Sequence, residues 1–452
     1  GMWAFALLDQ TEGCLWLSRD RFGKKPLYFF QDNEHFVFGS ELKALQQVSA
    51  TPKSLRADAI YDFFTYQYIP DPKTIFEKIY KLEPGHTLFV DSTGVKKNQY
   101  WNVSFSNKTD LSEAEISEQL LSLVDESVKE RMVSDVPLGA FLSGGVDSSG
   151  VVGLMAKNSS SQVTTCSIGF DSKKFDEVEF ASKVANQFKT DHHEFTVKKT
   201  VEDQLTNIVS YFDEPFADPS LVPTYFVSEL AKQQVTVALA GDGGDESFAG
   251  YSKYGVDALE NQLRNLFPKS IREKAFPFLA KIFRSSNSSI GKKAHTLLNT
   301  LSLDPAYGFF LTNSFFSDSL WKTLINDDFK QALGDYHPSS ITTQHYHEAD
   351  TDNHLDKILY TDIKTYLPGD ILVKVDRMSM ANSLEVRAPL LDYKIVEYAA
   401  TIPPSLKLNK GEKKHILKQA FSSLLTDETL YRKKMGFSVP LAHWLRHEIK
   451  QQ

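Results

Sequence analysis

The chain has 452 residues, of which 41% are hydrophobic and 12% aromatic, and its formal net charge is −8. Its length suits about three average domains or two larger ones, and its acidic balance argues against a nonspecific nucleic-acid surface. Two distant cysteines, Cys14 and Cys166, form neither a disulfide framework nor a metal pair. No apolar stretch spans a membrane, and residues 1–5 do not resemble a signal peptide. We therefore expect a cytoplasmic enzyme with no nucleic-acid or membrane partner; a homodimer is compatible with the sequence.

Residues 1 to about 105 are predicted to be rich in β-strands. Short apolar runs, such as those at 3–7, 15–17, 27–30 and 36–38, are separated by polar turns. Residues 40–45 are typical of a short helix. Cys14 lies in a strand-like run, where we expect a buried small apolar residue.

A polar segment, residues 103–111, is expected to link this part to the next. Ser112 and Glu115 then have the spacing of a capping box. The box predicts the start of a helix whose apolar face recurs at helical spacing. That face comprises Ile116, Leu120, Leu123, Val124 and Val128.

The stretch from Leu142 to Ser149 is the most informative motif of the sequence. An apolar run, residues 136–142, leads in as a buried strand, and a helical pattern follows over residues 148–157. Gly144 and Gly145 allow a sharp turn and a close approach of a ligand to the main chain. The helix start offers backbone N–H groups to an anion. Further expected ligands are the hydroxyls of Ser143, Ser148 and Ser149, and the carboxylate of Asp147, which needs Mg²⁺ to face phosphate.

Strand-like and helical segments alternate after this stretch. Strands are expected at residues 163–168, 193–197 and 235–240, and helices at 177–188, 201–212 and 222–234. This alternation predicts an α/β fold with a doubly wound parallel sheet, in which ligands lie beyond the carboxyl ends of the strands. The second glycine-rich segment, Ala240 to Glu246, falls there and predicts a magnesium site facing Asp147.

The remaining chain is predicted to be mainly helical. Residues 255–345 carry amphipathic segments without a motif of their own, and residues 351–450 continue in the same way. A basic cluster stands near the end, at Arg432, Lys433 and Lys434. Such clusters are usually solvated, but one beside an anionic nucleotide could hold the α-phosphate.

Two motifs resemble known families. The segment Ser143-Gly144-Gly145-x-Asp147-Ser148 resembles the pyrophosphate loop of the ATP-pyrophosphatases (adenine nucleotide alpha hydrolase-like), which cleave ATP between the α and β phosphates. Segments 1–6, 19–28 and 39–45 resemble the second half of a class II glutamine amidotransferase domain of the Ntn type. That resemblance implies that Asp20 binds the α-amino group of glutamine.

The amidotransferase family uses an N-terminal cysteine as nucleophile, and this chain begins with Gly1. We expect an N-terminally truncated form, with a partial glutaminase domain at residues 1–105 and a synthetase domain at 112–452. In this expectation the complete protein takes nitrogen from glutamine and the present chain takes it from ammonia only.

Together the segments resemble glutamine-dependent asparagine synthetase, and the segment from Asp213 to Thr224 matches that family as well. The resemblance implies that ATP adenylates aspartate, that pyrophosphate leaves from the loop at residues 142–149, and that ammonia then gives asparagine and AMP. The implied site residues are Asp147 and Asp245 for Mg²⁺, Lys434 for the transferring phosphorus, and Ile168 and Gly241 for the nucleoside.

One position departs from the family pattern. Asparagine synthetases commonly carry glutamate where this chain has Asp242, and the resemblance places that side chain near the acceptor and the ammonia. A different carboxylate acceptor, in surface-polysaccharide or secondary metabolism, is therefore also compatible with the sequence, and the absent nucleophile fits a β-lactam-forming synthetase too. A tRNA-thiolating relative would share the first loop but usually needs reactive cysteines and a basic surface, and the sequence shows neither. A non-catalytic homologue is the remaining alternative, and the intact Asp147, Asp245 and Lys434 argue against it.

Overall fold

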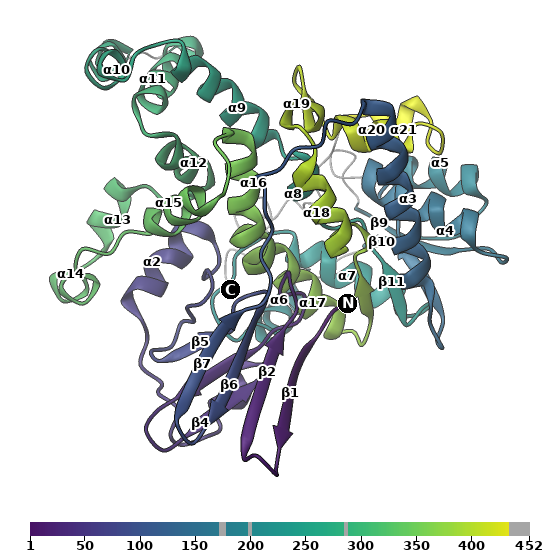
Figure 1. The fold of residues 1–452 in the computed structure, drawn as a ribbon, viewed down its shortest axis with the longest axis horizontal. Helices are drawn as coiled ribbons and strands as arrows, with labels where there is room; N and C mark the ends of the chain where they lie inside the picture. The colour runs from purple at the N-terminus through teal and green to yellow at the C-terminus, as the bar shows by residue number, and fades with distance from the viewer. Residues whose placement is uncertain (171–177, 198–200, 284–287, 434–452) are drawn as a thin grey trace.

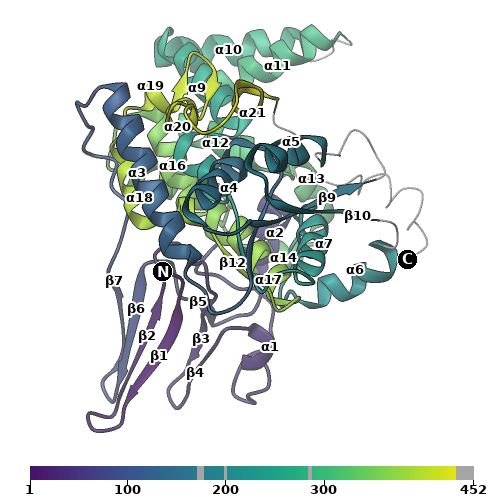
Figure 2. The ribbon, with the colours of Figure 1, turned by 90° about the vertical axis from the view of Figure 1, so that its right-hand side faces the viewer.

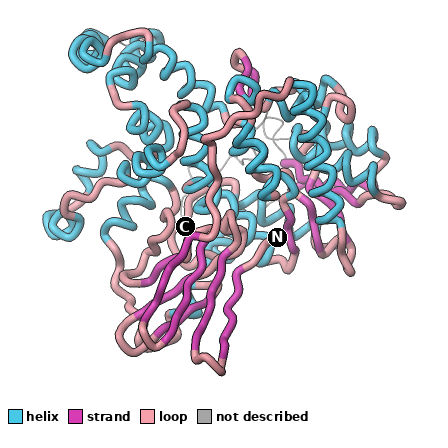
Figure 3. Tube along the Cα trace, in the orientation of Figure 1, coloured by secondary structure: helices cyan, strands magenta, loops and turns pink. Residues whose placement is uncertain are grey.

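The computed structural model describes residues 1–170, 178–197, 201–283 and 288–433. Two antiparallel sheets at the N-terminal end lie below a larger α/β and helical part (Figure 1). With the trace coloured by secondary structure, the lower part is mostly strand, and the larger part is mostly helix around a second group of strands (Figure 3). No helix of the described residues is long and apolar enough to cross a membrane.

The N-terminal part is rich in strands, as predicted. One sheet has the order β1-β2-β6-β7 and the other β4-β3-β5. Leu17, Leu27, Leu82 and Leu88 are buried together in one apolar cluster of the N-terminal part. Its helix α2 was not predicted. The elements are β1 (Ala4–Asp9), β2 (Cys14–Arg19), β3 (Tyr28–Gln31), β4 (Phe36–Gly39), α1 (Leu42–Leu45), α2 (Ala57–Tyr66), β5 (Ile79–Lys81), β6 (His86–Asp91) and β7 (Gly94–Gln99).

Helix α3 (Glu113–Met132) begins at the predicted capping box. The Ser112 hydroxyl accepts a hydrogen bond from the Glu115 amide at 3.4 Å, and the Glu115 carboxylate accepts one from the Ser112 amide at 2.8 Å. Four of the five residues of the predicted apolar face are buried, and Leu123 is partly buried against the same core. The hydrophobic period of the sequence therefore fixes which side of α3 packs inward.

The central sheet has the strand order β10-β9-β8-β11-β12, and every neighbouring pair is parallel. Its strands are β8 (Leu138–Phe141), β9 (Thr164–Phe170), β10 (Asp191–Val197), β11 (Val237–Leu239) and β12 (Glu385–Arg387). The chain builds outward from β8 to β10, then returns to the other side of β8 with β11. The predicted parallel sheet is confirmed, and its topological switch point lies between β8 and β11.

Helices cover both faces of this sheet. Successive side chains of a strand point to opposite faces, so neighbouring residues of one strand belong to different apolar cores. Ala140 and Leu239 belong to the core formed with α3 and α4 (Val146–Asn158). Phe141 and Ala238 belong to the core on the opposite face, with α7 (Leu221–Ala231) and α17 (Leu372–Met380). Helices α5 (Val178–Phe188) and α6 (Val201–Ser210) lie between α4 and α7 in the sequence.

The described part of residues 351–450 is mainly helical, as predicted, and strand β12 is an element that the sequence did not predict. It has only three residues, too few for a period to be visible in the sequence. It is a strand because Val386 is buried and its backbone pairs with β11.

The remaining described elements are mostly helices, as predicted, and several of them lie above the sheet (Figure 2). They are α8 (Gly244–Phe248), α9 (Ser252–Asn265), α10 (Lys269–Phe283), α11 (Ser289–Ser302), α12 (Pro305–Asn313), α13 (Asp318–Leu324), α14 (Asp327–Leu333), α15 (Ser339–Glu348), α16 (His354–Lys364), η1 (Leu367–Ile371), η2 (Pro389–Leu391), α18 (Tyr393–Thr401), α19 (Pro404–Lys407), β13 (Leu408–Asn409), β14 (Glu412–Lys413), α20 (His415–Phe421) and α21 (Asp427–Tyr431).

Candidate active site

The two glycine-rich loops meet at the switch point of the central sheet. They follow β8 and β11, which pair directly, with Leu239 opposite Ala140. A Cβ atom on Gly241 would lie 2.8 Å from both the Cβ of Asp147 and the amide nitrogen of Ser148. Glycine is therefore required at 241, because the second loop packs against the start of α4.

The first loop is held by its own serines. The hydroxyls of Ser143 and Ser148 are 3.0 Å apart, and the Ser143 hydroxyl accepts from the amide of Gly145 at 3.3 Å. Gly144 has φ +69°, and a Cβ there would lie 2.5 Å from the carbonyl carbon of Phe180. The loop is thus preorganised at the N-terminus of α4, where backbone N–H groups favour an anion.

Three of the predicted contact residues are more enclosed than the loop itself. Leu142 is buried, and its amide donates to the Cys166 carbonyl at 2.9 Å. Ser149 is completely buried, and its hydroxyl has no hydrogen-bond partner among the described residues. Ile168 is buried with the apolar side chains of α7. These residues support the loop and the strands beside it.

Lys414 joins the two predicted magnesium ligands. Its ammonium nitrogen lies 2.5 Å from Oδ2 of Asp147 and 2.8 Å from Oδ1 of Asp245, and the side chain is buried. Burial alone would lower the pKa of Lys414, but the two carboxylates outweigh burial and the pKa is raised. The structure therefore places both predicted carboxylates against one cation, the Lys414 ammonium, and their binding of Mg²⁺ stays a prediction.

The two carboxylates suit a magnesium ion that is also bound by phosphate. Oδ1 of Asp147 is buried and has no hydrogen-bond partner in the described part of the chain, so one hard oxygen ligand is available. No group of three or more His, Cys, Asp or Glu residues in the described ranges could hold a metal ion. A cation here would therefore take further oxygens from water and from a nucleotide, as Mg²⁺ does in many phosphate-transfer sites.

Arg432 brings the predicted basic cluster to the first loop. Its guanidinium donates to the carbonyl of Gly144 at 2.8 Å and to that of Ser143 at 3.1 Å. It also lies 4.6 Å from the ring centroid of Phe180. Lys434, the predicted catalytic lysine, lies outside the described residues, two positions beyond this contact.

Asp242 stands near a second group of charges. Burial raises the pKa of its carboxyl, Asp147 and Asp245 raise it further, and Lys374 opposes them. Lys374 on α17 is buried, 2.5 Å from Asp218. Although burial opposes it, Lys374 lowers the pKa of Asp218 to about 2. The site thus presents a carboxyl, Asp242, between the predicted magnesium ligands and a buried ion pair.

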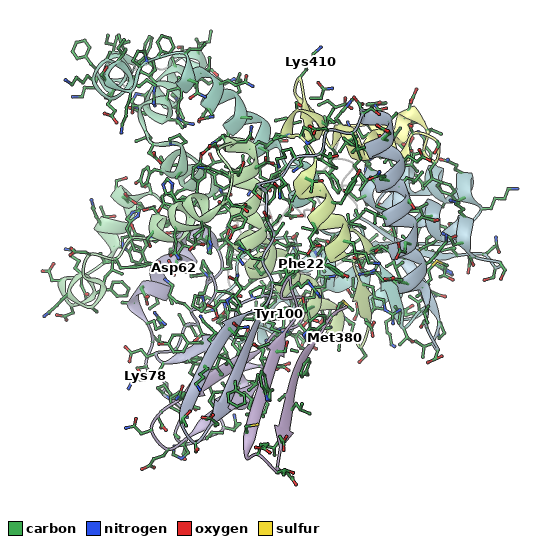
Figure 4. The ribbon with its side chains drawn as sticks, viewed as in Figure 1. Phe22, Asp62, Lys78, Tyr100, Met380 and Lys410 are labelled. Atoms are coloured by element: carbon green, nitrogen blue, oxygen red, sulfur yellow. The ribbon has the colours of Figure 1, made fainter. Side chains whose placement is uncertain are left out.

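Asp20 has a different environment from the carboxylates of the central sheet. It is fully buried, and its oxygens accept from the amides of Phe22, Lys24 and Lys25, each at 3.1 Å. Its hydrogen bonds thus hold the 20–25 turn. That turn lies at the upper end of the N-terminal sheets, where Phe22 and Tyr100 meet the helical part (Figure 4).

The Asp213-Glu214 pair, which the resemblance placed between the two loops, contacts the N-terminal part. Asp213 accepts from the amide of Leu42 at 2.8 Å, and Glu214 forms an ion pair with Lys81 at 2.5 Å. Lys25 and Asp376 form another pair across the same boundary, at 2.6 Å. These buried and partly buried pairs hold the two parts of the molecule together.

Sequence reasoning did not select Lys414 or Lys374 as site residues. Lys374 is close in sequence to other charged residues, Asp376 and Arg377, but no spacing rule connects it with Asp218. Lys414 follows two other charged residues, Glu412 and Lys413, and that pattern is ordinary for a solvated turn. Only the fold brings these lysines to the loops.

Comparison with known proteins agrees with this arrangement. The asparagine synthase family model matches residues 119–452, and a glutamine amidotransferase domain model matches residues 1–101. Asparagine synthetase [glutamine-hydrolyzing] 1 of Bacillus subtilis is 33% identical over 458 residues, which cover 100% of this chain and 70% of that protein.

Two further relatives show the breadth of the group. Putative asparagine synthetase [glutamine-hydrolyzing] 2 of Methanocaldococcus jannaschii is 36% identical over 390 residues, covering 84% of this chain and 72% of that protein. Amidase chyE of Penicillium rubens is 26% identical, covering 100% of this chain and 72% of that protein. The chain therefore belongs to the asparagine synthetase family, the glutamine-hydrolysing carbon–nitrogen ligases that combine an amidotransferase domain with an asparagine synthase domain.

Proposed function

We propose that this chain converts aspartate to asparagine through a β-aspartyl-AMP intermediate. The observation that carries the proposal is the pair Asp147 and Asp245, which share one buried cation, Lys414, beside an anion-binding loop. An aspartate β-carboxylate oxygen attacks the α-phosphorus of ATP, and the bond to the β-phosphate bridging oxygen breaks. Ammonia then attacks the acyl carbon, AMP leaves, and the proton passes to a base.

The residues of the site divide this work. The loop at residues 142–149 binds the leaving pyrophosphate through its amides and serine hydroxyls. Asp147 and Asp245 hold Mg²⁺, which when bound supplies positive charge to the phosphates. Lys414 is positioned to contact a phosphate oxygen once its carboxylate partners bind the metal. Lys434 stabilises charge at the transferring phosphorus.

A second candidate is amide synthesis on a different carboxylate acceptor, and Asp242 favours it. Its side chain is one methylene shorter than the glutamate that asparagine synthetases commonly carry. A displacement of about 1 Å at a reacting centre can cost about 10²-fold in rate. The acceptor then has to differ in length or the pocket has to compensate, and the cluster of Lys374, Asp218 and Asp242 is the region to compare.

The test is pyrophosphate release from Mg-ATP with ammonium chloride, measured with and without aspartate. Ammonium makes the result independent of the glutamine-dependent half-reaction. Aspartate-dependent release, with asparagine and AMP formed in equal amounts, supports the proposal. Binding of Mg-ATP without turnover on aspartate would favour the second candidate, and absence of Mg-ATP binding would reject both.

A further inference from the structure

Helices α10 and α11 form a hairpin with a large amount of exposed apolar surface. Both views show it at the top of the molecule, at the end opposite the N-terminal sheets (Figures 1 and 2). The helices pack on each other, and α11 also contacts α9. Phe278 is 68% exposed, Ile282 62% and Ile290 81%. Single exposed apolar residues are ordinary, but a group of this size on one projecting element indicates a binding surface.

Three of the exposed apolar residues of α10, including the two most exposed, lie on one face. Ile271, Phe278 and Ile282 are separated by seven and four residues, which places them on a single stripe of a helix. Phe276 and Ala280, on the other side, are buried, and the Ala280 carbonyl is 2.8 Å from the Nδ1 atom of His295 on α11. The inner face of α10 thus packs against α11, whereas its outer apolar stripe has no partner among the described residues.

Lysines border this stripe. Lys274 and Lys281 each lie three residues after a stripe residue, which places them along its edge. The described hairpin residues, 266–283 and 288–302, contain six Lys or Arg and one acidic residue, Glu273. The whole chain carries a net charge of −8, so the hairpin is a local region of opposite sign.

We propose that the α10–α11 hairpin binds the surface of an anionic lipid bilayer. An apolar stripe of Phe and Ile bordered by Lys and Arg is the pattern of helices that lie in a membrane interface. The apolar side chains enter the boundary of headgroups and acyl chains, and the lysines contact the anionic headgroups. The prediction of no membrane partner rested on the lack of a spanning segment, and a hairpin that lies on the surface does not need one.

Charge favours a lipid surface over the other occupants. A symmetric contact with a second copy would bring two basic hairpins together, and like charges would oppose it. A nucleic acid would pair with the lysines, but its phosphates would leave the Phe and Ile side chains in water. An anionic bilayer satisfies both components of the stripe.

The experiment is sedimentation of the full chain with vesicles. Vesicles of phosphatidylcholine alone are compared with vesicles of phosphatidylcholine and phosphatidylglycerol in a 3:1 ratio. We expect binding to the anionic vesicles at least tenfold tighter than to the neutral ones, weakened by salt. Each lysine near the surface contributes about fivefold, so Lys274→Gln together with Lys281→Gln should weaken binding about 25-fold. The variant Phe278→Ser with Ile282→Ser should prevent it.

Two controls separate this surface from general stickiness. Leu320→Ser with Lys322→Gln removes an exposed leucine and lysine from α13 and should leave vesicle binding unchanged. Phe278→Trp should show a blue shift in fluorescence on anionic vesicles, whereas Leu320→Trp should not. Unchanged thermal unfolding of every variant verifies folding. Equal binding to both kinds of vesicle, no binding, or a dimer in light scattering that is lost in the Phe278→Ser/Ile282→Ser variant would overturn the proposal.

Discussion

Two buried lysines beside aspartate-bearing loops have opposite properties. Lys24 lies near Asp20 in the N-terminal part, and burial lowers its pKa to about 8 although the charge of Asp20 opposes this shift. Asp20 itself accepts hydrogen bonds from three amides of its own turn. Lys414 lies between Asp147 and Asp245, whose charges outweigh burial and raise its pKa. We therefore expect the Asp20 carboxylate, which its own turn satisfies, to act mainly on stability, and the Asp147 and Asp245 carboxylates, which share the Lys414 ammonium, to act on ligand binding.

The same substitution in the two regions gives the largest expected contrast. Asp147→Asn removes one negative charge from the predicted magnesium site, and we expect pyrophosphate release to fall about 10³-fold, the upper range for loss of one preorganised electrostatic group. Asp20→Asn is the matched control in the other region. Its ammonium-dependent rate should stay near that of the wild type, and an equal loss in both variants would remove the distinction between the regions.

Lys434 tests the nucleotide side of the comparison. We expect Lys434→Ala to lower the rate of pyrophosphate release by about 10²–10³-fold, as for removal of one donor at the developing charge. Lys433→Ala, one position earlier in the same basic run, should have little effect because Lys433 is exposed. Full activity of Lys434→Ala would show that the transferring phosphorus has another partner.

The side-chain length at position 242 tests which acceptor the pocket fits. Asp242→Glu adds one methylene, and we expect the ammonium-dependent rate with the native acceptor to fall about 10²-fold. Steady-state rates with aspartate are the measurement. A faster reaction with aspartate in the variant would mean that the native pocket serves a different acceptor.

Asp20→Asn should act on stability. The substitution weakens hydrogen bonds from the turn amides to a charged group and leaves a buried amide in their place. We expect the free energy of unfolding to fall by about 1–3 kcal/mol. Urea denaturation followed by circular dichroism measures the change; an unaltered midpoint would show that the turn holds without the carboxylate.

Lys24 gives an effect on stability that appears only at high pH. Its pKa is about 8 in the folded protein and 10.5 for the ordinary side chain, so between these values the unfolded chain binds more protons. The free energy of unfolding should therefore rise as pH increases from 8 to 10.5, by up to about 3 kcal/mol from this residue. Lys24→Met should flatten that rise in pH-dependent urea denaturation. An identical slope in the variant would locate the effect elsewhere.

Local patterns account for the parts of the fold that the sequence predicted. The capping box at Ser112, the apolar run around Ala140 and the glycines at 144 and 145 each act through neighbours in the chain. Lys414 could not be predicted in this way, because it lies 267 residues from Asp147 in sequence. Strand β12 was missed for a similar reason, since three residues become a strand only by pairing with β11.

We propose that the two loops at the switch point of the central sheet bind Mg-ATP through Asp147 and Asp245. Isothermal titration of Mg-ATP into the wild-type chain and into Asp147→Asn tests it most directly. We expect one Mg-ATP site in the wild type, with a dissociation constant in the micromolar to millimolar range usual for enzyme substrates. In Asp147→Asn we expect this site to bind Mg-ATP at least tenfold more weakly. Equal affinity in both proteins, or no binding to the wild type, would contradict it.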